Sequence, residues 1–416
     1  MSIVSPWKHD FPVYLSHAHP NLCYLDSAAT CLTPKHVADA VFHYQCYAHA
    51  NSHKGLYQLS ASVTERVEHA REQVANFIGA HSGENISFNH GTTDAINLVA
   101  YSFVEPLLIE KQEGDQANIV ISAAEHHANL LPWQRLAQQY NVELRIAPLN
   151  KDGTINQANL SALLDSDTIF LAITHCSNVL GLMNPVANIC RIARNKGIPT
   201  LIDGAQAICK GAVDVSEIDC DFYVFSAHKI YGPTGCGVLY AKGSLFDSMR
   251  PYQLGGGVIE SVNYQQSRFI TGPLKFEPGS HNVAAIVGLI EAIDYMTDIS
   301  WHDVNQYIDN LANYMHSELE NLPFYQPLIK RGDSNEKEKI STLVSFQVKK
   351  VHCHDIASLL DNDGIAIRAG HHCAQPLHQT LGVNASIRAS LGLYNDVSDI
   401  DKLVASLTTA HKMMSL

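Results

Sequence analysis

The sequence predicts an α/β fold with a mostly parallel central sheet in a large domain and a smaller α+β C-terminal domain. Short apolar runs alternate with amphipathic stretches through the middle of the chain, as in a parallel sheet covered by helices. Two of these runs, PTLIDGAQA (199–207) and DFYVFSAHK (221–229), end in polar, ionisable residues. A chain of 416 residues is too long for one domain with a single typical core and is long enough for two domains.

The predicted strands of the central sheet are short runs rich in Val, Ile, Leu, Phe and Tyr. They cover residues 118–122, 142–148, 168–174, 200–203, 222–226 and 237–241. Between them, residues 130–140 and 184–197 have the apolar period of a helix, and Gly197 is a suitable C-cap.

The rest of the chain predicts loops, a long helix and a second unit. Residues 243–282 are rich in Gly, Pro and Tyr and predict irregular loops over a site, and a long helix is expected near 283–296. Beyond it we expect a polar loop at 330–339, strands at 343–349 and 364–368, and a helix at 354–362. We therefore expect a large domain over 20–296 and a small domain over 297–416, with residues 1–19 packed on the small domain.

Composition and charge exclude several classes of protein. The net charge of −13 argues against a general surface for nucleic acid or anionic membranes. No apolar run approaches the roughly 18 residues of a membrane span, and the first residues lack the pattern of a secretory signal. The ten cysteines are scattered without a CxxC pair, which favours a reducing compartment. We therefore expect a cytoplasmic protein with neither nucleic acid nor membrane as a partner.

Ionisable residues follow two of the predicted buried strands. Asp203 and Gln206 follow the first, and Ser226, His228 and Lys229 follow the second. Ligands of open α/β sheets bind beyond the carboxyl ends of the strands. A lysine can form a Schiff base with a pyridine aldehyde, and a carboxylate can keep the ring nitrogen protonated. The two strand ends therefore predict a pyridoxal phosphate site.

Four further features support this site, although each has a simpler interpretation. GTTDAINLVA (91–100) has the form of a helix N-terminus, which either binds a phosphate or is an ordinary capped helix. EHHAN (125–129) places an imidazole after a strand, either against a flat cofactor or in a solvated loop. Asn178 either donates a hydrogen bond to a cofactor or substrate oxygen or is a turn residue. Arg388 either binds a substrate carboxylate through two hydrogen bonds or is a structural arginine.

A cysteine lies in the segment RAGHHCAQPL (368–377). Cys373 follows two histidines and lies five residues after Arg368. Neighbouring cationic groups would raise the thiolate fraction of this cysteine. A metal site of His371, His372 and Cys373 is the rival interpretation, but adjacent residues rarely all reach one ion, and we expect no metal.

From YLDSAAT (24–30) to RASLGLYN (388–395), the chain resembles the cysteine desulfurases, which are fold-type I, class V aminotransferase-like enzymes that use pyridoxal phosphate. RAGHHCA and DFYVFSAHKIYGPTG (221–235) resemble the second group of these enzymes, the Suf and Csd types and the selenocysteine lyases, and YLDSAAT with RAGHHCAQPL favours the Csd type. The resemblance implies conversion of L-cysteine to L-alanine, with activity extending to L-selenocysteine and cysteine sulfinate. It also implies a homodimer and a sulfur acceptor of the SufE or CsdE kind. A selenocysteine lyase, a transaminase and, from another class, a zinc-binding protein remain alternatives.

The resemblance also implies a role for each site residue. Lys229 would carry the cofactor, Asp203 would pair with the ring nitrogen, Gln206 with the ring hydroxyl, and His126 would stack on the ring. Thr93, Ser226 and His228 would hold the phosphate, with Ser280 reaching it from the other subunit. Asn178, Arg388 and Arg368 would hold the substrate, and Cys373 would carry the persulfide. Lys54, Ala227 and Ser280 depart from the arginine, glycine and threonine expected at these positions.

Overall fold

A seven-stranded sheet forms the centre of the computed structural model, which describes residues 4–53, 55–111, 116–329 and 342–414. The strand order is β2 (Ile86–Asn89), β8 (Gly237–Ala241), β7 (Phe222–Ser226), β6 (Thr200–Asp203), β5 (Thr168–Thr174), β3 (Asn118–Ser122) and β4 (Glu143–Ala147). Strands β7, β6, β5, β3 and β4 are parallel, and β8 runs antiparallel to both β7 and β2. The six predicted strands are all present, which confirms the mostly parallel sheet; β2 was not predicted.

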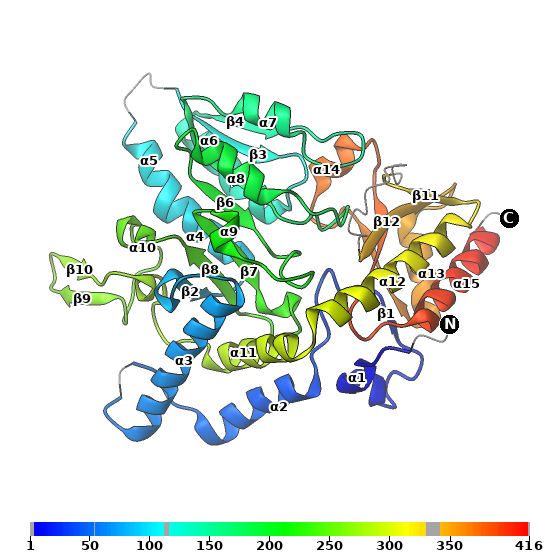
Figure 1. Cartoon of the computed structure of the whole chain (residues 1–416), viewed down its shortest axis with the longest axis horizontal. Coiled ribbons are helices and arrows are strands. Elements are labelled where there is room, and N and C mark those ends of the chain that lie inside the picture. The colour runs from blue at the N-terminus through cyan, green and yellow to red at the C-terminus, as the bar shows by residue number, and fades with distance from the viewer. Residues whose placement is uncertain (1–3, 54, 112–115, 330–341, 415–416) are drawn as a thin grey trace.

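The sheet is buried on both faces because its strands are apolar at consecutive positions. In β7, Phe222 and Val224 join one apolar cluster while Tyr223 and Phe225 join the other, as the alternation of side chains requires. The first cluster includes residues of α4 (Thr92–Val99) and α6 (Leu131–Tyr140). The second includes residues of α3 (Gln58–Phe77), α8 (Val186–Arg194) and α11 (Val283–Asp298). Figure 1 shows these helices around the sheet.

Residues 243–282 are more regular than predicted. They contain α10 (Leu245–Ser248) and a hairpin of β9 (Ile259–Val262) and β10 (Ser267–Phe269), which projects from the body at the left of Figure 1. The turn is stable because Asn263 Oδ1 accepts hydrogen bonds from the amides of Gln265 and Gln266. The composition of this stretch predicted loops because the hairpin turn depends on a single side chain, that of Asn263, which composition does not reveal.

A second, four-stranded sheet has the order β11 (Tyr325–Pro327), β12 (Leu343–Val348), β15 (Ser386–Ser390) and β14 (Arg368–Gly370). Helices α12 (Trp301–Glu320), α13 (Cys353–Asn362) and α15 (Val397–Met414) contribute to its apolar cluster. The strand predicted at 364–368 is divided into β13 (Ile365–Ala366) and β14, and the predicted loop at 330–339 lies outside the described residues.

The remaining helices connect these layers. They are α1 (Pro12–Leu15), α2 (Lys35–His43), α5 (Glu105–Ile109), α7 (Gln157–Leu163), α9 (Val215–Ile218) and α14 (Gln375–Thr380), together with two π-helical turns at Tyr44–Ala48 and Ala100–Val104.

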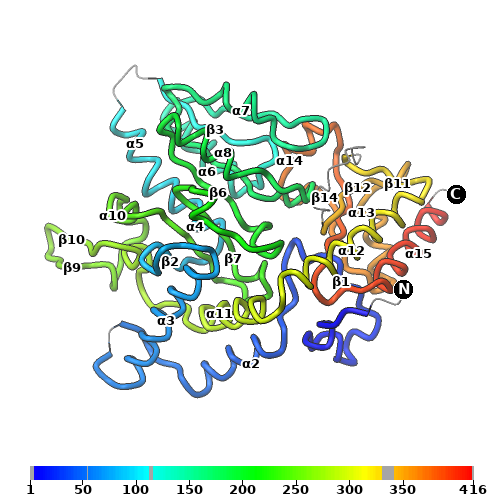
Figure 2. Tube along the Cα trace, viewed as in Figure 1, coloured from blue at the N-terminus to red at the C-terminus, as the bar shows by residue number. Residues whose placement is uncertain are grey.

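The N-terminal segment packs among C-terminal elements. Strand β1 (Cys23–Tyr24) pairs in parallel with β13, and Asp26 bridges to Ser390. Phe11 packs edge-on against Tyr394, with ring centroids 4.8 Å apart. Figure 2 shows the blue start of the tube below the yellow helix α12 and the red helix α15. The domain boundaries at residues 20 and 296 stay a prediction.

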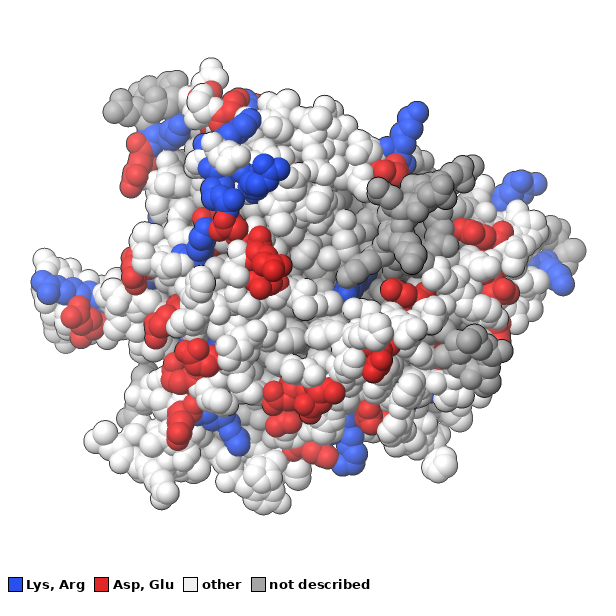
Figure 3. All heavy atoms as spheres, in the orientation of Figure 1, with Lys and Arg blue, Asp and Glu red and all other residues white. Residues whose placement is uncertain are grey.

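The chain has 41 acidic and 28 basic residues, which gives the net charge of −13. Figure 3 shows acidic side chains spread across one face, with lysines and arginines mixed among them towards its upper edge. Among the described residues, no helix is both long and apolar enough to cross a membrane.

Candidate active site

A cavity of about 630 Å³ lies at the carboxyl ends of the central strands. Its lining includes eleven of the twelve predicted site residues: Thr93, His126, Asn178, Asp203, Gln206, Ser226, His228, Lys229, Arg368, Cys373 and Arg388. Ser280 instead lines an adjacent cavity of about 60 Å³, which shares His90 and Asp94 with the large one. The fold thus brings together, in a single chain, every predicted residue except the one expected from a second subunit.

Lys229 and Asp203 reach the cavity from neighbouring parallel strands. Asp203 is the last residue of β6, and Lys229 ends the 3-10 turn that follows β7. The Lys229 ammonium donates a hydrogen bond to the carbonyl of Ala28, which also accepts one from Gln206 Nε2 at 2.6 Å. Burial, with a contribution from nearby Arg388, lowers the pKa of Lys229 to about 8. A substantial fraction of this lysine is therefore a neutral, nucleophilic amine near pH 8.

Asp203 is 5 % exposed, and its carboxyl accepts a hydrogen bond from the amide of Ala205 at 3.0 Å. Burial raises the pKa of Asp203 to about 6, despite opposing contributions from this hydrogen bond and from Lys229. A cationic partner, such as a protonated ring nitrogen, would stabilise the ionised form of this buried carboxyl group.

The N-terminus of α4 forms another wall of the cavity. Gly91 precedes the helix with φ of 138°, a conformation that a side chain would strain. Ser226 Oγ accepts a hydrogen bond from the amide of Thr92 at 2.8 Å and lies 2.7 Å from Thr92 Oγ1. Thr92 was not predicted as a site residue. Its position beside Thr93 at the start of the helix could have indicated a role in the site. This end of the cavity combines a helix N-terminus with hydroxyl groups, which suits an anion.

His126 is held as a neutral imidazole. Its Nδ1 accepts a hydrogen bond from the amide of Ala128 at 3.0 Å. Burial and the proximity of Lys229 lower the pKa of His126 to about 4. A neutral, oriented ring in the cavity wall is suited to stack on a flat ligand.

Glu125 is a buried neighbour of His126 that sequence reasoning missed. Its carboxyl lies within 2.5 to 2.9 Å of Ser122 Oγ, Asn129 Nδ2 and the amide of Thr174. Burial raises the pKa of Glu125 to about 8. The network joins the ends of β3 and β5 and thereby fixes the loop that carries His126. The available signal was an acid at the exit of an apolar strand.

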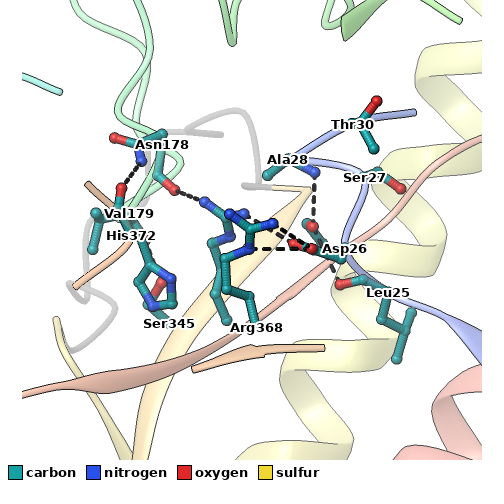
Figure 4. Close-up of polar contacts among 12 residues, drawn as sticks. Leu25, Asp26, Ser27, Ala28, Thr30, Asn178, Val179, Ser345, Arg368 and His372 are labelled. Atoms are coloured by element: carbon teal, nitrogen blue, oxygen red, sulfur yellow. Dashed lines mark hydrogen bonds and ion pairs between the residues drawn. The ribbon is translucent and has the colours of Figure 1, made fainter. Parts of the chain in front are cut away.

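Arg388 and Arg368 form a pair at the opposite end of the cavity. The Arg388 guanidinium donates to the carbonyl of Asn178 at 2.9 Å and to Asp26 Oδ1 at 3.0 Å. Arg368 Nε donates to Asp26 Oδ2 at 3.2 Å. Figure 4 shows Asp26 at the centre of these contacts. Asp26 received no role from the sequence, although it lies within the YLDSAAT motif.

Cys373 lies in a loop with two consecutive left-handed residues, His372 (φ 50°) and Cys373 (φ 55°). The carbonyl of His372 accepts a hydrogen bond from Asn178 Nδ2 at 2.6 Å. Asn178 is thus a tie between the two sheets in addition to its predicted contact with substrate. Cys373 itself is exposed. The main chain of the loop is fixed while the thiol remains accessible.

The histidines next to Cys373 do not converge with it on one point. His372 is buried, and its Nε2 lies 2.9 Å from Ser386 Oγ, which also lies 2.9 Å from His378 Nε2. Within the described ranges, no group of three or more His, Cys, Asp and Glu residues could hold a metal ion. In the HCH segment (352–354), the two histidines are exposed but Cys353 is buried at the start of α13. Cys353 is buried because the first turn of α13 faces the small sheet.

Comparisons with known proteins agree with this geometry. The family model described as aminotransferase class-V matches residues 23–403. A cysteine desulfurase of Salmonella newport (strain SL254) is 43 % identical over 412 residues, covering 98 % of each chain. The crystal structure of the cysteine desulfurase CsdA of Escherichia coli superposes with a TM-score of 0.88 at 34 % identity, covering 98 % of each chain. The apo structure of a cysteine desulfurase of Thermococcus onnurineus NA1 gives a TM-score of 0.89 at 32 % identity, covering 100 % of each chain.

Proposed function

The chain belongs to the class-V aminotransferase family, whose members depend on pyridoxal phosphate, and we propose that it acts as a cysteine desulfurase. It converts L-cysteine to L-alanine and retains the sulfur on Cys373 as a persulfide. The observation that carries the proposal is that Lys229 and Cys373, which follow strands of different sheets, line one cavity.

The residues of the cavity fit pyridoxal phosphate. A volume of about 630 Å³ accommodates a cofactor with a small substrate. The Lys229 amine, with its lowered pKa, suits attachment to an aldehyde, and the buried carboxylate of Asp203 suits a ring nitrogen. When bound, the cofactor supplies an electron sink at the α-carbon of the substrate.

We assign the remaining contacts with the cofactor by the same criteria. Gln206 binds the ring hydroxyl, and His126 stacks on the ring. Thr93, Ser226 and His228 bind the phosphate, and Ser280 reaches it from a second subunit. The hydroxyls and the start of α4 support the phosphate assignment.

The protein's own groups then carry the reaction. Arg388, Asn178 and Arg368 hold the substrate carboxylate, and Lys229 takes the α-proton. The Cys373 thiolate attacks the substrate sulfur, so that an S–S bond forms as the bond from sulfur to the β-carbon breaks. The two carbons are then protonated, and the products are L-alanine and a persulfide, which balances atoms and electrons without an external oxidant.

The proposal is tested by recording the visible absorbance of the holoenzyme and by measuring alanine after addition of L-cysteine. We expect a yellow protein whose spectrum changes with cysteine and which releases one alanine per sulfur transferred. Transamination without sulfur release would contradict the proposal, since a transaminase does not require Cys373. L-selenocysteine is tested in parallel, because selenium leaves more readily than sulfur and its release therefore depends less on Cys373.

We further propose a homodimer that passes sulfur to an acceptor protein of the SufE or CsdE kind, in a pathway of the Csd type. Large apolar side chains such as Leu56 and Tyr264 are fully exposed in the single chain, which supports burial against a second copy. The mass in solution, measured by sedimentation, tests the dimer. All ten cysteines are free, which supports a cytoplasmic location.

A further inference from the structure

Six carboxylic acid side chains are buried in the part of the chain that the structure describes: Glu105, Glu125, Asp203, Glu277, Asp396 and Asp399. Four of them form an ion pair with an arginine or a lysine, namely Glu105 with Arg250, Glu277 with Arg71, and Asp396 and Asp399 with Lys8. Among the described residues, Glu125 and Asp203 have no such pair. Buried charges in proteins are normally paired, so the environment of these two carboxyls is incomplete without a cation.

The two unpaired carboxyls are neighbours at one edge of the central sheet. Thr174, the last residue of β5, is the register partner of Asp203 in β6, and the amide of Thr174 donates to Glu125 Oε1 at 2.9 Å. The charge of Asp203 contributes to the raised pKa of Glu125. Asp203 lines the cavity, where the proposed function gives it a cationic ring nitrogen as its partner. Glu125 lies close enough to Asp203 to interact with the same cation.

The hydrogen bonds around Glu125 favour its ionised form. Trp133 Nε1 can only donate, and it donates to Asn129 Oδ1 at 3.0 Å, so that Asn129 Nδ2 is the atom that donates to Glu125 Oε2, at 2.6 Å. Each oxygen of the carboxylate thus accepts from a group that can only donate, and Ser122 Oγ adds a third contact. Burial opposes ionisation and raises the pKa of Glu125 to about 8, so that a nearby cation decides its charge at neutral pH.

The side chain next to Glu125 does not supply this cation. The imidazole of His126 accepts from the amide of Ala128, and its pKa is lowered to about 4, so it is neutral. Pyridoxal phosphate, held as proposed, brings two protonatable nitrogens into the cavity, one in its ring and one in its link to Lys229. Both are positive when protonated, and both are stabilised by nearby negative charge.

We propose that Glu125 is a second acidic partner of the cofactor, a positioning residue whose negative charge adds to that of Asp203 and keeps the bound cofactor protonated. A protonated ring draws electrons from the α-carbon of the substrate more strongly, so that Glu125 promotes removal of the α-proton by Lys229. This inference rests on the proposed function for the placement of the cofactor, but not for the fate of the substrate sulfur.

The test compares the holoenzyme with its Glu125→Gln variant, which keeps the shape of the side chain and removes its charge. The visible absorbance is recorded against pH, because protonation of the nitrogen that joins Lys229 to the cofactor changes the colour. We expect the midpoint of this titration to fall by about one pH unit in Glu125→Gln, because one unit charge at intermediate dielectric changes a nearby protonation equilibrium about tenfold. The shift should persist in high salt, since Glu125 is buried.

Two further variants separate charge from structure. Glu105→Gln is the matched control, because Glu105 is also 4 % exposed but pairs with Arg250 outside the cavity, and it should keep the wild-type midpoint. Glu125→Asp keeps the charge and should keep the wild-type midpoint even where the shorter side chain lowers kcat. An unchanged midpoint in Glu125→Gln, or an equal fall in Glu105→Gln, would overturn the inference.

Exchange of the α-proton of L-alanine in deuterated water provides a readout that involves no sulfur. Its rate, followed by NMR, should fall about tenfold in Glu125→Gln, and an unchanged rate would also overturn the inference. Failure of the wild-type enzyme to form alanine from cysteine would refute the proposed function, and the absorbance midpoint would still decide the role of Glu125. An unchanged midpoint in an enzyme that forms alanine would refute only the role of Glu125.

Discussion

The amide of His127 donates a hydrogen bond of 2.7 Å to the carbonyl of Cys373. His127 follows strand β3 of the central sheet, and Cys373 follows β14 of the second sheet. The imidazole of His127 adds a second tie, since its Nε2 accepts a hydrogen bond from the amide of Gln375 at 3.1 Å. The position of the proposed nucleophile is thus set by a loop of the sheet that provides Lys229.

Replacing the Cys373 thiol should stop sulfur transfer without affecting the cofactor. In Cys373→Ser we expect the visible spectrum to persist and alanine formation from L-cysteine to fall by at least about 100-fold, because a hydroxyl is a poor nucleophile toward sulfur. Cys46→Ser is the matched control, because Cys46 is the other exposed cysteine. Desulfurase activity in Cys373→Ser near that of Cys46→Ser would exclude the assigned role.

Removing the Lys229 amine should abolish covalent attachment of the cofactor. We expect Lys229→Ala to lose the visible absorbance of protein-linked pyridoxal phosphate after dialysis and to lose turnover by about 1,000-fold or more, since both attachment and proton transfer depend on this nitrogen. The absorbance spectrum and acid-released cofactor are measured together. Lys242→Ala, which removes a lysine paired with Asp219 at the surface, should resemble wild type. A retained, borohydride-reducible link in Lys229→Ala would contradict the assignment.

The guanidinium of Arg388 should be needed for substrate affinity rather than for folding. Lysine keeps the charge but cannot bind a carboxylate through two parallel hydrogen bonds. We therefore expect Arg388→Lys to raise KM for L-cysteine about 100-fold, equivalent to ~2.7 kcal/mol, with a smaller change in kcat. Arg145→Lys, at an exposed ion pair, serves as the control. A normal KM in Arg388→Lys would show that the carboxylate binds elsewhere.

The buried pair of Arg71 and Glu277 should stabilise the fold in a pH-dependent way. Arg71 donates to both oxygens of Glu277, at 2.7 and 3.1 Å, and the amide of Phe88 donates to one of them at 2.7 Å. Burial alone would raise the pKa of Glu277, but the charge of Arg71 and contacts from His281 and Arg71 lower it to about 2. Because the folded pKa lies below the unfolded value near 4.5, this stabilisation is present above about pH 4.5 and is lost as the pH falls towards 2.

We accordingly expect Glu277→Gln to lower the free energy of unfolding by about 3 kcal/mol at pH 7. The difference from wild type, measured by urea unfolding, should shrink as the pH is lowered from 4.5. Glu143→Gln, at an exposed ion pair, should change stability by less than about 1 kcal/mol. A pH-independent difference would mean that packing rather than charge is responsible.

Much of the central sheet could be predicted because its strands are apolar at consecutive positions and end in conspicuous polar residues. Asp203 and Lys229 are one example, because β6 and β7 are neighbouring parallel strands whose carboxyl ends lie at the same edge of the sheet. Asp26 could not be found in this way, because its contacts depend on pairings between distant segments, such as β1 with β13, which no local pattern specifies. Glu125 follows a predicted strand as Asp203 does, but its role depends on burial and on the contact with Thr174, which the strand pattern does not give. Ser280 lines a separate small cavity, so that its contact with a phosphate from a second subunit stays a prediction, and Lys54 lies outside the described residues.

The pairing of β1 with β13 has a consequence for biosynthesis. The contacts of Asp26 cannot form until Arg388, which follows it by 362 residues, has been synthesised. At synthesis rates of about 5 to 20 residues per second, the wait is roughly 20 to 70 seconds. During translation the central sheet can assemble from its own segments, while the N-terminal segment remains without its partner strands. The end of the cavity that contains Arg388 is therefore completed only when β15 leaves the ribosome, and a chain truncated before β15 cannot form it.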